Sequence, residues 1–187
     1  AKSAVVGANG TLYTFGSGSY GRLGHGEELD VFVPKLVDTL QRENIAQVAC
    51  GAFHTVILTS NGMIFSCGSG RYGQLGHDGF ADGGMPNFLE PSLILEGGEV
   101  EYTLVACGTF HTIALTSDKK VRSWGFGGSG RLGHAPKSGS KSDSTLLDEY
   151  FKPTTILTLK NVDITGVLDL KEDQSNNADQ EGNASTG

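Results

Sequence analysis

Short runs of apolar and β-branched residues, separated by turn residues, dominate this chain. The clearest pair of runs lies at residues 55–67, on either side of the turn Asn61-Gly62. Runs of this length around an Asn-Gly pair predict a β-hairpin. Similar pairs occur at residues 4–15 and 113–124. The pattern therefore predicts an all-β fold built from repeated hairpins.

Each predicted hairpin is followed by the same sequence, which we call the glycine phrase. It reads G-x-G-x-x-G-x-L-G-H and occurs at residues 16–25, 68–77 and 125–134, with offsets of 52 and 57 residues. Self-similarity at periods of this length marks an array of small supersecondary units. The chain contains 28 glycines, about twice the usual share of roughly 7 %. Their place in the repeated phrase indicates tight turns rather than a flexible linker.

Two further patterns share this register. Residues 48–55 read VACGAFHT, and residues 105–112 read VACGTFHT. A proline followed by an aliphatic residue three positions later and a valine fourteen positions later occurs three times, at Pro34, Pro91 and Pro153. In this register Ala1 enters in the middle of a repeat and Lys2 takes the position of His54. We therefore expect the strand and loop that precede this position in the other repeats to be missing.

Composition and charge exclude several classes of protein. The formal net charge is −7, and the concentrated basic face of a nucleic-acid binder is absent, so we expect no direct nucleic-acid binding. No run approaches the ~20 consecutive apolar residues of a membrane span, and we recognise no secretory leader. The 3 cysteines suit a reducing compartment better than a disulfide framework. We expect an intracellular protein, cytoplasmic or nuclear, that does not contact membranes.

The C-terminal residues differ in composition from the repeats. After Val167 the register requires another Cys-Gly-x-Phe-His phrase, but residues 168–187 are polar and acidic. Such a segment has too little apolar surface to offset the entropy lost on ordering. We therefore expect a repeat region at residues 1–167 and a disordered tail at residues 168–187. An array interrupted at both ends is typical of a fragment.

Several motifs suggest chemistry, but each belongs to the repeated pattern. The G-x-G-x-x-G spacing at residues 16–21 matches a dinucleotide-binding fingerprint, which requires one copy between a strand and a helix. Cys50 and His54, like Cys107 and His111, have ligand-like spacing, but a zinc site requires about four converging ligands. All 5 histidines occupy repeated positions, so we expect them to form hydrogen bonds across turns or between repeats. We predict no catalytic residues, no cofactor and no bound metal.

On these phrases, the chain resembles the regulator of chromosome condensation repeat family. The paired C-G-x-x-H-T and G-x-x-x-x-G-x-L-G-H phrases carry the resemblance over roughly residues 1–167. The Trp-Asp signature of WD repeats and the glycine doublet of kelch repeats are absent. The resemblance implies a β-propeller whose blades are four-stranded antiparallel sheets. Family propellers usually close with seven blades and about three are present here, so we expect missing sequence or another chain to supply the others.

Residues that differ between repeats are the candidates for function. The connections from the glycine phrase to the repeated proline, at residues 26–33, 78–90 and 135–152, contain 8, 13 and 18 residues. Such growth on one face, and apolar residues in the second connection, suggest partner contact. Arg and Tyr residues in the glycine phrases are suited either to recognise an acidic protein surface or to cover the neighbouring strand. The candidate partner-binding residues are Tyr20, Arg22, Arg71, Tyr72, Phe80, Met85, Phe88 and Arg131.

We therefore expect a protein-interaction or regulatory scaffold module without a catalytic site of its own. The alternative, implied by the family's founding activity, is guanine-nucleotide exchange on a Ran-like small GTPase. Members of that branch often carry an acidic residue just after the glycine of the Cys-Gly-x-x-His loop, where this chain has Ala52 and Thr109. A third interpretation is that the repeats regulate a catalytic domain elsewhere in a longer protein, such as a HECT-type ubiquitin ligase or a kinase.

Overall fold

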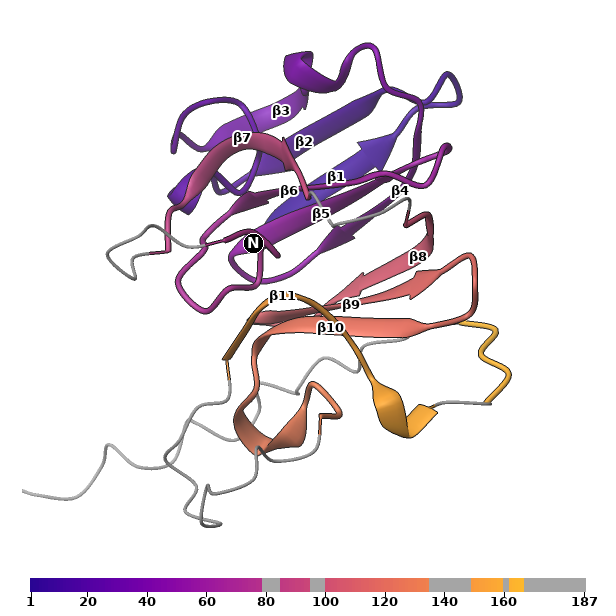
Figure 1. Cartoon of the computed structure of the whole chain (residues 1–187). Helices are drawn as coiled ribbons and strands as arrows, with labels where there is room; N and C mark the ends of the chain where they lie inside the picture. Colours follow the sequence, from indigo (N-terminus) through magenta and orange to yellow (C-terminus); the bar gives the residue numbers. More distant parts are fainter. Residues whose placement is uncertain (79–84, 95–99, 135–148, 160–161, 167–187) are drawn as a thin grey trace, which may run out of the picture.

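The computed structural model describes residues 1–78, 85–94, 100–134, 149–159 and 162–166 of the chain. In these ranges the chain forms three antiparallel β-sheets and four three-residue 3-10 turns, and no α-helix. Figure 1 shows the sheets packed face to face in sequence order, from the indigo first sheet to the orange third sheet. The predicted all-β class is confirmed. The predicted tail at residues 168–187 lies outside the described residues.

Each sheet is a run of neighbouring strands. The first sheet has the order β1-β2-β3, with β1 at Lys2–Val6, β2 at Leu12–Gly16 and β3 at Val31–Leu36. The second has the order β4-β5-β6-β7, with β4 at Ile45–Cys50, β5 at His54–Thr59, β6 at Ile64–Gly68 and β7 at Phe88–Leu93. The third has the order β8-β9-β10-β11, with β8 at Tyr102–Cys107, β9 at His111–Thr116, β10 at Val121–Phe126 and β11 at Glu149–Thr155. The 3-10 turns are η1 at Ser19–Gly21, η2 at Asp38–Leu40, η3 at Gly128–Gly130 and η4 at Leu157–Leu159.

The predicted hairpins and their register are confirmed. They are the pairs β1–β2, β5–β6 and β9–β10. Lys2 pairs with Gly16, as His54 pairs with Gly68 in the second sheet. Lys2 therefore takes the position of His54, as the repeats predict. Among the described residues, no strand of the first sheet corresponds to β4 or β8.

The outermost strand of each sheet begins earlier than the sequence predicted. We had assigned the residues before the repeated proline to loops, but β3, β7 and β11 begin 3, 3 and 4 residues before it. Proline lacks the N–H that a ladder requires, and it is tolerated here because three residues bulge out of each edge strand. These outer bulges are residues 32–34, 89–91 and 151–153, each opposite a single residue of the neighbouring strand.

Most of the apolar core lies between the sheets, at two joints, and a smaller cluster in and beside the third sheet contains Leu115, Val121 and Ile156. Six buried residues form the joint of the first and second sheets: Leu12, Val37, Leu40, Ile45, Ile57 and Cys67. Ten form the joint of the second and third sheets: Ala49, Val56, Leu58, Ile64, Ile94, Tyr102, Val105, Cys107, Ala114 and Trp124. Because each sheet buries its faces against its neighbours, stability depends on the joints more than on any single sheet.

The glycine phrases allow the backbones of neighbouring sheets to approach each other closely at the joints. Gly21 and Gly73 have φ values of +75° and +74°, a region that residues with a side chain rarely adopt. A Cβ atom at Gly21 would lie 2.5 Å from the Cα of Leu89, and one at Gly73 would lie 2.8 Å from the Cα of Phe151. The outer bulge of each following sheet therefore rests directly on glycine backbone. This is the structural role that three copies of the phrase predicted.

In two of the connections between the glycine phrase and the repeated proline, a side chain near the end bonds the backbone near the start. The backbone N–H of Gly18 donates to the carboxylate of Asp30 at 2.9 Å, and that of Gly70 donates to the side-chain oxygen of Asn87 at 3.3 Å. In both sheets the acceptor lies four residues before the repeated proline. The two ends of the connection are thus held together although the connections differ in length.

Candidate functional site

Five aromatic side chains form a continuous row across the three sheets, which we call the aromatic row. Ring centroids are 5.7 Å apart for Tyr20 and Phe53, 5.4 Å for Phe53 and Phe110, 5.1 Å for Phe110 and Tyr72, and 5.2 Å for Tyr72 and Phe126. Phe53 and Phe110 are stacked, and the Tyr20 and Tyr72 rings meet them edge-on. These offsets are favourable for aromatic pairs.

The aromatic row lies at one end of the sheets because of the strand register. Phe53 and Phe110 come just before β5 and β9, and Tyr72 belongs to the glycine phrase that follows β6. Since β5 and β6 are antiparallel, the start of β5 and the end of β6 meet at the same end of the sheet. Each of these rings is partly exposed.

Arginines accompany the row. The guanidinium carbon of Arg71 lies 5.5 Å from the centre of the Tyr72 ring, and that of Arg131 lies 4.7 Å from the centre of the Phe126 ring. These distances are within the range of cation–π attraction. Arg71 is exposed and Arg131 is partly exposed. The end of the sheets therefore combines apolar rings with cationic groups that remain accessible.

Arg22 has a different environment from the other two arginines. Its side chain is buried, and it donates to the carbonyl oxygens of Ser17 and Ala52, both at 2.7 Å. The second bond crosses to the neighbouring sheet. Of the two interpretations left open by the sequence, the contact with the neighbouring sheet describes Arg22, whereas Arg71 is exposed and the Nε of Arg131 donates to the carbonyl of Gly128 in its own turn at 2.7 Å.

Backbone strain accompanies one member of the row. Tyr20 has a φ of +64°, which is uncommon for a residue other than glycine, asparagine or aspartate. The equivalent residue in the third sheet, Ser129, has a φ of +59°. The first and third copies of the phrase therefore share this conformation, whereas Tyr72, the equivalent residue of the second copy, does not have a positive φ. In the first sheet the conformation accompanies a large aromatic side chain at the surface, where Tyr20 is exposed.

The other predicted residues belong to the second connection and its strand. Phe88 is the first residue of β7 rather than a loop residue, and its ring centroid lies 4.6 Å from that of the His77 ring. Its backbone carbonyl lies beside Gly21, the residue after Tyr20. Met85 precedes that strand and is partly buried. Phe80 lies outside the described residues. The structure thus brings together Tyr20, Arg71, Tyr72 and Arg131, with Arg22 beneath them, whereas the Phe88 ring contacts His77.

Sequence reasoning missed three members of the row, Phe53, Phe110 and Phe126. The first two belong to the repeated Cys-Gly-x-Phe-His phrase, which we had assigned to the scaffold. Phe53 lies in the bend just before β5, so the alternation of strand side chains does not place it, and no signal within a single repeat found it.

Hydroxyl groups position the histidines of the glycine phrase. The Nε2 atoms lie against a hydroxyl in the second strand of each hairpin: His25 against Thr14 at 2.9 Å, His77 against Ser66 at 3.0 Å and His134 against Ser123 at 2.9 Å. Each hydroxyl donates to a backbone carbonyl of the glycine phrase: Leu23 at 2.6 Å, Leu75 at 2.8 Å and Leu132 at 2.7 Å. Because the hydroxyl hydrogen is already donated, Nε2 carries the hydrogen of the imidazole. As predicted, these histidines form hydrogen bonds across turns, and the bonding partner of each imidazole is a threonine or serine hydroxyl.

His54 links the second and third sheets. Its Nε2 lies 3.0 Å from the hydroxyl of Thr112, which donates to the carbonyl of Gln74 at 2.9 Å. Its side chain is fully buried, and this burial lowers the pKa of His54 to about 3. The imidazole is therefore neutral at physiological pH and acts as a hydrogen-bond donor, not as a charged group.

We expect the chain to lose stability as the pH falls below about 6.5, the ordinary pKa of a histidine in an unfolded chain. Between that value and the folded pKa of about 3, the unfolded state binds the His54 proton first, so each pH unit favours unfolding by about 1.4 kcal/mol. Through His54 alone, the free energy of unfolding should be about 2 kcal/mol lower at pH 5 than at pH 7. Urea denaturation at both pH values measures this.

The matched control for this pH dependence is His54→Gln, which keeps a donor and removes the titration. Burial also lowers the pKa of His25, His77 and His134, so the variant should retain part of the effect. It should lose about 2 kcal/mol less than the wild type over the same pH range. Equal losses in the two proteins would contradict the assignment to His54.

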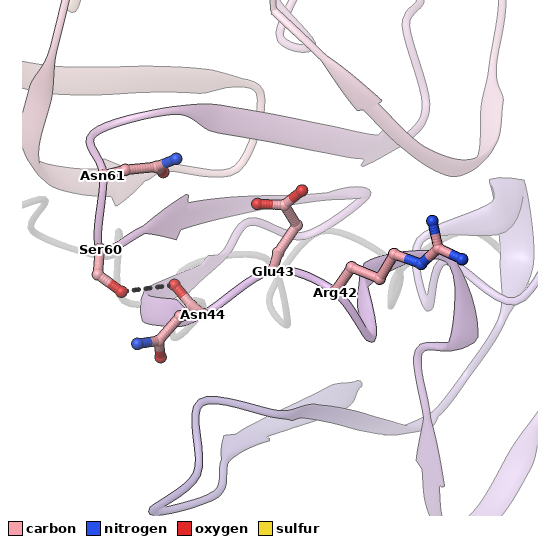
Figure 2. Close-up of a pocket in the computed structure, with 5 residues that line it drawn as sticks. All are labelled: Arg42, Glu43, Asn44, Ser60 and Asn61. Atoms are coloured by element: carbon pink, nitrogen blue, oxygen red, sulfur yellow. Dashed lines mark hydrogen bonds between the residues drawn. The ribbon is translucent and has the colours of Figure 1, made fainter.

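An open pocket of about 330 Å³ lies at the opposite end of the sheets, beside the β5–β6 turn. It is lined by Arg42, Glu43, Asn44, Ser60 and Asn61. Figure 2 shows the Ser60 hydroxyl directed at the backbone carbonyl of Asn44, to which it donates at 2.8 Å. The Ser60 N–H donates to the same carbonyl. The polar groups nearest the turn are thus already hydrogen-bonded to each other at the end of the second sheet.

Other classes of site have characteristic structural elements. Within the described ranges, no three histidine, cysteine, aspartate or glutamate side chains lie together as metal ligands would. None of the described residues forms a helix long and apolar enough to cross a bilayer. The G-x-G-x-x-G sequence at residues 16–21 ends in the short turn η1, and the next element is the strand β3 rather than the helix that a dinucleotide site requires.

Solved structures share the fold. The crystal structure of Prp20p from Saccharomyces cerevisiae matches with a TM-score of 0.69 and 21% identity, over 83% of this chain and 36% of that one. Human WBSCR16 matches with a TM-score of 0.67 and 24% identity, over 82% of this chain and 35% of that one. The three sheets are therefore blades of a β-propeller, as the resemblance implied.

The sequence comparisons agree with the structural ones. Human E3 ubiquitin-protein ligase HERC2 is 43% identical over 134 residues, which are 71% of this chain and 3% of that protein. Two models of the regulator of chromosome condensation (RCC1) repeat match, one at residues 9–58 and 61–115 and the other at residues 45–74 and 102–131. Since these matches cover more than half of the chain, it belongs to the RCC1 repeat family.

Proposed function

We propose that the chain is a protein-interaction module that binds an acidic protein segment on the aromatic row. The observation that carries the proposal is the combination of five partly or fully exposed rings with the accessible guanidinium groups of Arg71 and Arg131. Tyrosine, phenylalanine and arginine are enriched in the centres of protein interfaces. The rings supply apolar area, and the two cations favour carboxylates.

The rigidity of the row supports the same conclusion. Its members lie on strand ends and short turns, and each ring contacts at least one other ring. Ordering such side chains on binding requires little entropy, because they are already fixed by their neighbours. Little of the contact free energy with a partner is therefore lost to ordering these side chains, and most of it contributes to affinity.

The proposal places the chain in a non-catalytic role within a longer protein. The chain spans 3% of human HERC2 and 14% of mouse HERC4, both named as E3 ubiquitin-protein ligases, the second as a probable one. In a protein of that kind, a module with this surface would recognise a substrate or regulatory partner while another domain performs the transfer. The residues of the row offer binding groups and no nucleophile.

Removing the two accessible arginines should weaken the binding of an acidic peptide about tenfold or more, because interface arginines contribute a large share of affinity. The probe is a fluorescent peptide of alternating glutamate and tyrosine, and the measurement is fluorescence anisotropy with wild-type protein and with the double variant Arg71→Ala, Arg131→Ala. Tyr72→Ala should weaken binding as well, through lost ring contact.

Arg42→Ala is the matched control, because Arg42 is an exposed arginine at the opposite end of the sheets. It should leave the affinity unchanged. An equal loss with Arg42→Ala would show that only net charge matters, and a wild-type protein that does not distinguish the peptide from its glutamine counterpart would contradict the proposal.

Guanine-nucleotide exchange is the alternative function, and a second experiment distinguishes it from the peptide-binding module. Loss of labelled GDP from a Ran-like GTPase, measured with and without the chain, tests it directly. Acceleration that disappears in the double variant Arg71→Ala, Arg131→Ala would assign the row to a GTPase. Unchanged release together with peptide binding is the result expected of an interaction module.

A further inference from the structure

The first and second sheets hold the ends of their connections in the same way, so the charges of the two connections can be compared position by position. A Cβ atom at Gly18 would lie 1.9 Å from the carbonyl oxygen of Leu29, and one at Gly70 would lie 2.0 Å from that of Pro86. Leu29 and Pro86 each lie 5 residues before the repeated proline. The residues on either side of them therefore occupy equivalent places: Glu28 and Asp30 in the first sheet, Met85 and Asn87 in the second.

These places are charged in the first sheet and uncharged in the second. Glu28 and Asp30 are both exposed. Asp30 accepts a hydrogen bond from the N–H of Gly18, which lies two residues before Tyr20 of the aromatic row. The Tyr20 end of the row therefore has two exposed carboxylates beside it.

Charge in the glycine phrase differs in the opposite sense. The residue before the tyrosine is Ser19 in the first sheet and Arg71 in the second. Arg71 is exposed and lies over the Tyr72 ring, and Arg131 lies over the last ring of the row. One end of the aromatic row is thus bordered by carboxylates and the other by guanidinium groups.

The other described carboxylates of the second connection leave this difference in place. Asp78 forms an ion pair with Lys152 at 2.7 Å. The Glu90 carboxylate lies across the joint, where its Oε1 would be 3.0 Å from a Cβ atom at Gly26 of the first sheet. Neither group therefore offsets the cationic charge of Arg71.

The place of Asp30 faces solvent even where a sheet has neighbours on both sides. The second sheet packs against the first and the third, and Asn87, which takes the place of Asp30 there, is exposed. Packing of a preceding sheet against the first sheet is therefore compatible with an accessible Asp30 carboxylate.

We propose that the segment bound by the aromatic row is bipolar, with carboxylates over Arg71 and Arg131 and with lysine or arginine at the Tyr20 end. This inference rests on the proposed function, because it concerns the same row. A uniformly acidic segment would bring like charges against Glu28 and Asp30, whereas a bipolar segment meets opposite charges at both ends. The surface charges therefore also determine the direction in which the segment lies.

Two fluorescent peptides of equal composition test the proposal. The block peptide has three glutamates, a central Tyr-Gly-Tyr and three lysines, and the mixed peptide alternates glutamate and lysine on both sides of the same centre. Wild-type protein should bind the block peptide about threefold or more tightly than the mixed peptide, because several exposed charge pairs each contribute modestly. Fluorescence anisotropy measures this preference, which should decrease at high salt.

The double variant Glu28→Gln, Asp30→Asn removes the two carboxylates from the Tyr20 end. Asparagine keeps the acceptor for the Gly18 N–H, since Asn87 accepts from Gly70 in the second sheet. The variant should lose most of the preference for the block peptide, because the lysines of that peptide no longer meet opposite charges.

The matched control is the double variant Glu43→Gln, Glu101→Gln, which changes the net charge equally. Glu43 lines the pocket at the opposite end of the sheets, and Glu101 lies against Gly62 in the turn beside that pocket. The control should keep the preference of the wild type. An equal loss in the two double variants would overturn the proposal, because net charge alone would then explain it.

The peptide of alternating glutamate and tyrosine separates this inference from the proposed function. If the wild type binds that peptide and does not distinguish the block from the mixed peptide, the bipolar segment is wrong and the interaction module stands. If the wild type binds none of the three peptides, both proposals are overturned. A preference for the block peptide that persists in Glu28→Gln, Asp30→Asn would also overturn the bipolar segment.

Discussion

Replacing Trp124 by alanine should lower the free energy of unfolding by about 3–5 kcal/mol, the range observed for large aromatic residues in protein cores. Trp124 is fully buried at the joint of the second and third sheets. Its indole Nε1 donates to the carbonyl of Gln74 at 3.0 Å. Alanine would leave a cavity at the joint and remove this bond. Urea denaturation, monitored by circular dichroism, measures the change.

Trp124→Phe separates the two contributions. It keeps most of the ring volume and removes the N–H, so we expect a loss of about 1–2 kcal/mol. Thr112 also donates to the Gln74 carbonyl, so the acceptor keeps one partner. A loss as large as that of Trp124→Ala would mean that the hydrogen bond, not the packing, stabilises the joint.

Gly73→Ala should lower the free energy of unfolding by about 3 kcal/mol. A positive φ costs an alanine about 1–2 kcal/mol, and its Cβ would lie 2.8 Å from the Cα of Phe151, which forces the outer bulge of the third sheet to move. Overpacking of this kind costs about 1–3 kcal/mol more. Thermal and urea unfolding both report the change.

Gly130→Ala is the control for Gly73→Ala because it shares the conformation and lacks the contact. The φ values are +71° and +74°, but a Cβ at Gly130 would meet none of the described residues within 4 Å. We expect a loss of only about 1–2 kcal/mol. Equal losses for the two variants would mean that backbone strain alone explains the glycine and that the joint is not tightly packed.

The hairpins and their register could be predicted because each rests on a pattern that occurs three times, and the propeller fold was implied by the family resemblance that these phrases carry. Lys2 illustrates this well, since the repeats place it in the position of His54, and it pairs with Gly16 as His54 pairs with Gly68. The predicted start of β7 was wrong, because the sequence analysis took Pro91 as the boundary of the strand and the strand begins at Phe88. A bulge in an edge strand accommodates proline, and only the pairing of Gly68 with Phe88 reveals it.

The candidate site was predicted in part, and the missing part has a physical cause. Arg22 and Arg131 occupy the same position of the phrase, yet Arg22 is buried against the carbonyl of Ala52 and Arg131 lies over the Phe126 ring. The difference depends on whether a following sheet covers the residue. Phe53 and Phe110 were missed for a related reason, because exposure of a repeated residue is decided by how neighbouring sheets stack, and a single repeat carries no record of it.

The hydrogen bonds at the base of the connections allow the length of a connection to change without moving the strands that it joins. Asp30 and Asn87 bond Gly18 and Gly70 at the same point of the repeat, although 11 residues lie between the first pair and 16 between the second. Lengthening a closed loop adds entropy only logarithmically. A foreign recognition peptide grafted within such a connection would therefore leave the blades in place, which makes the chain a natural scaffold for display.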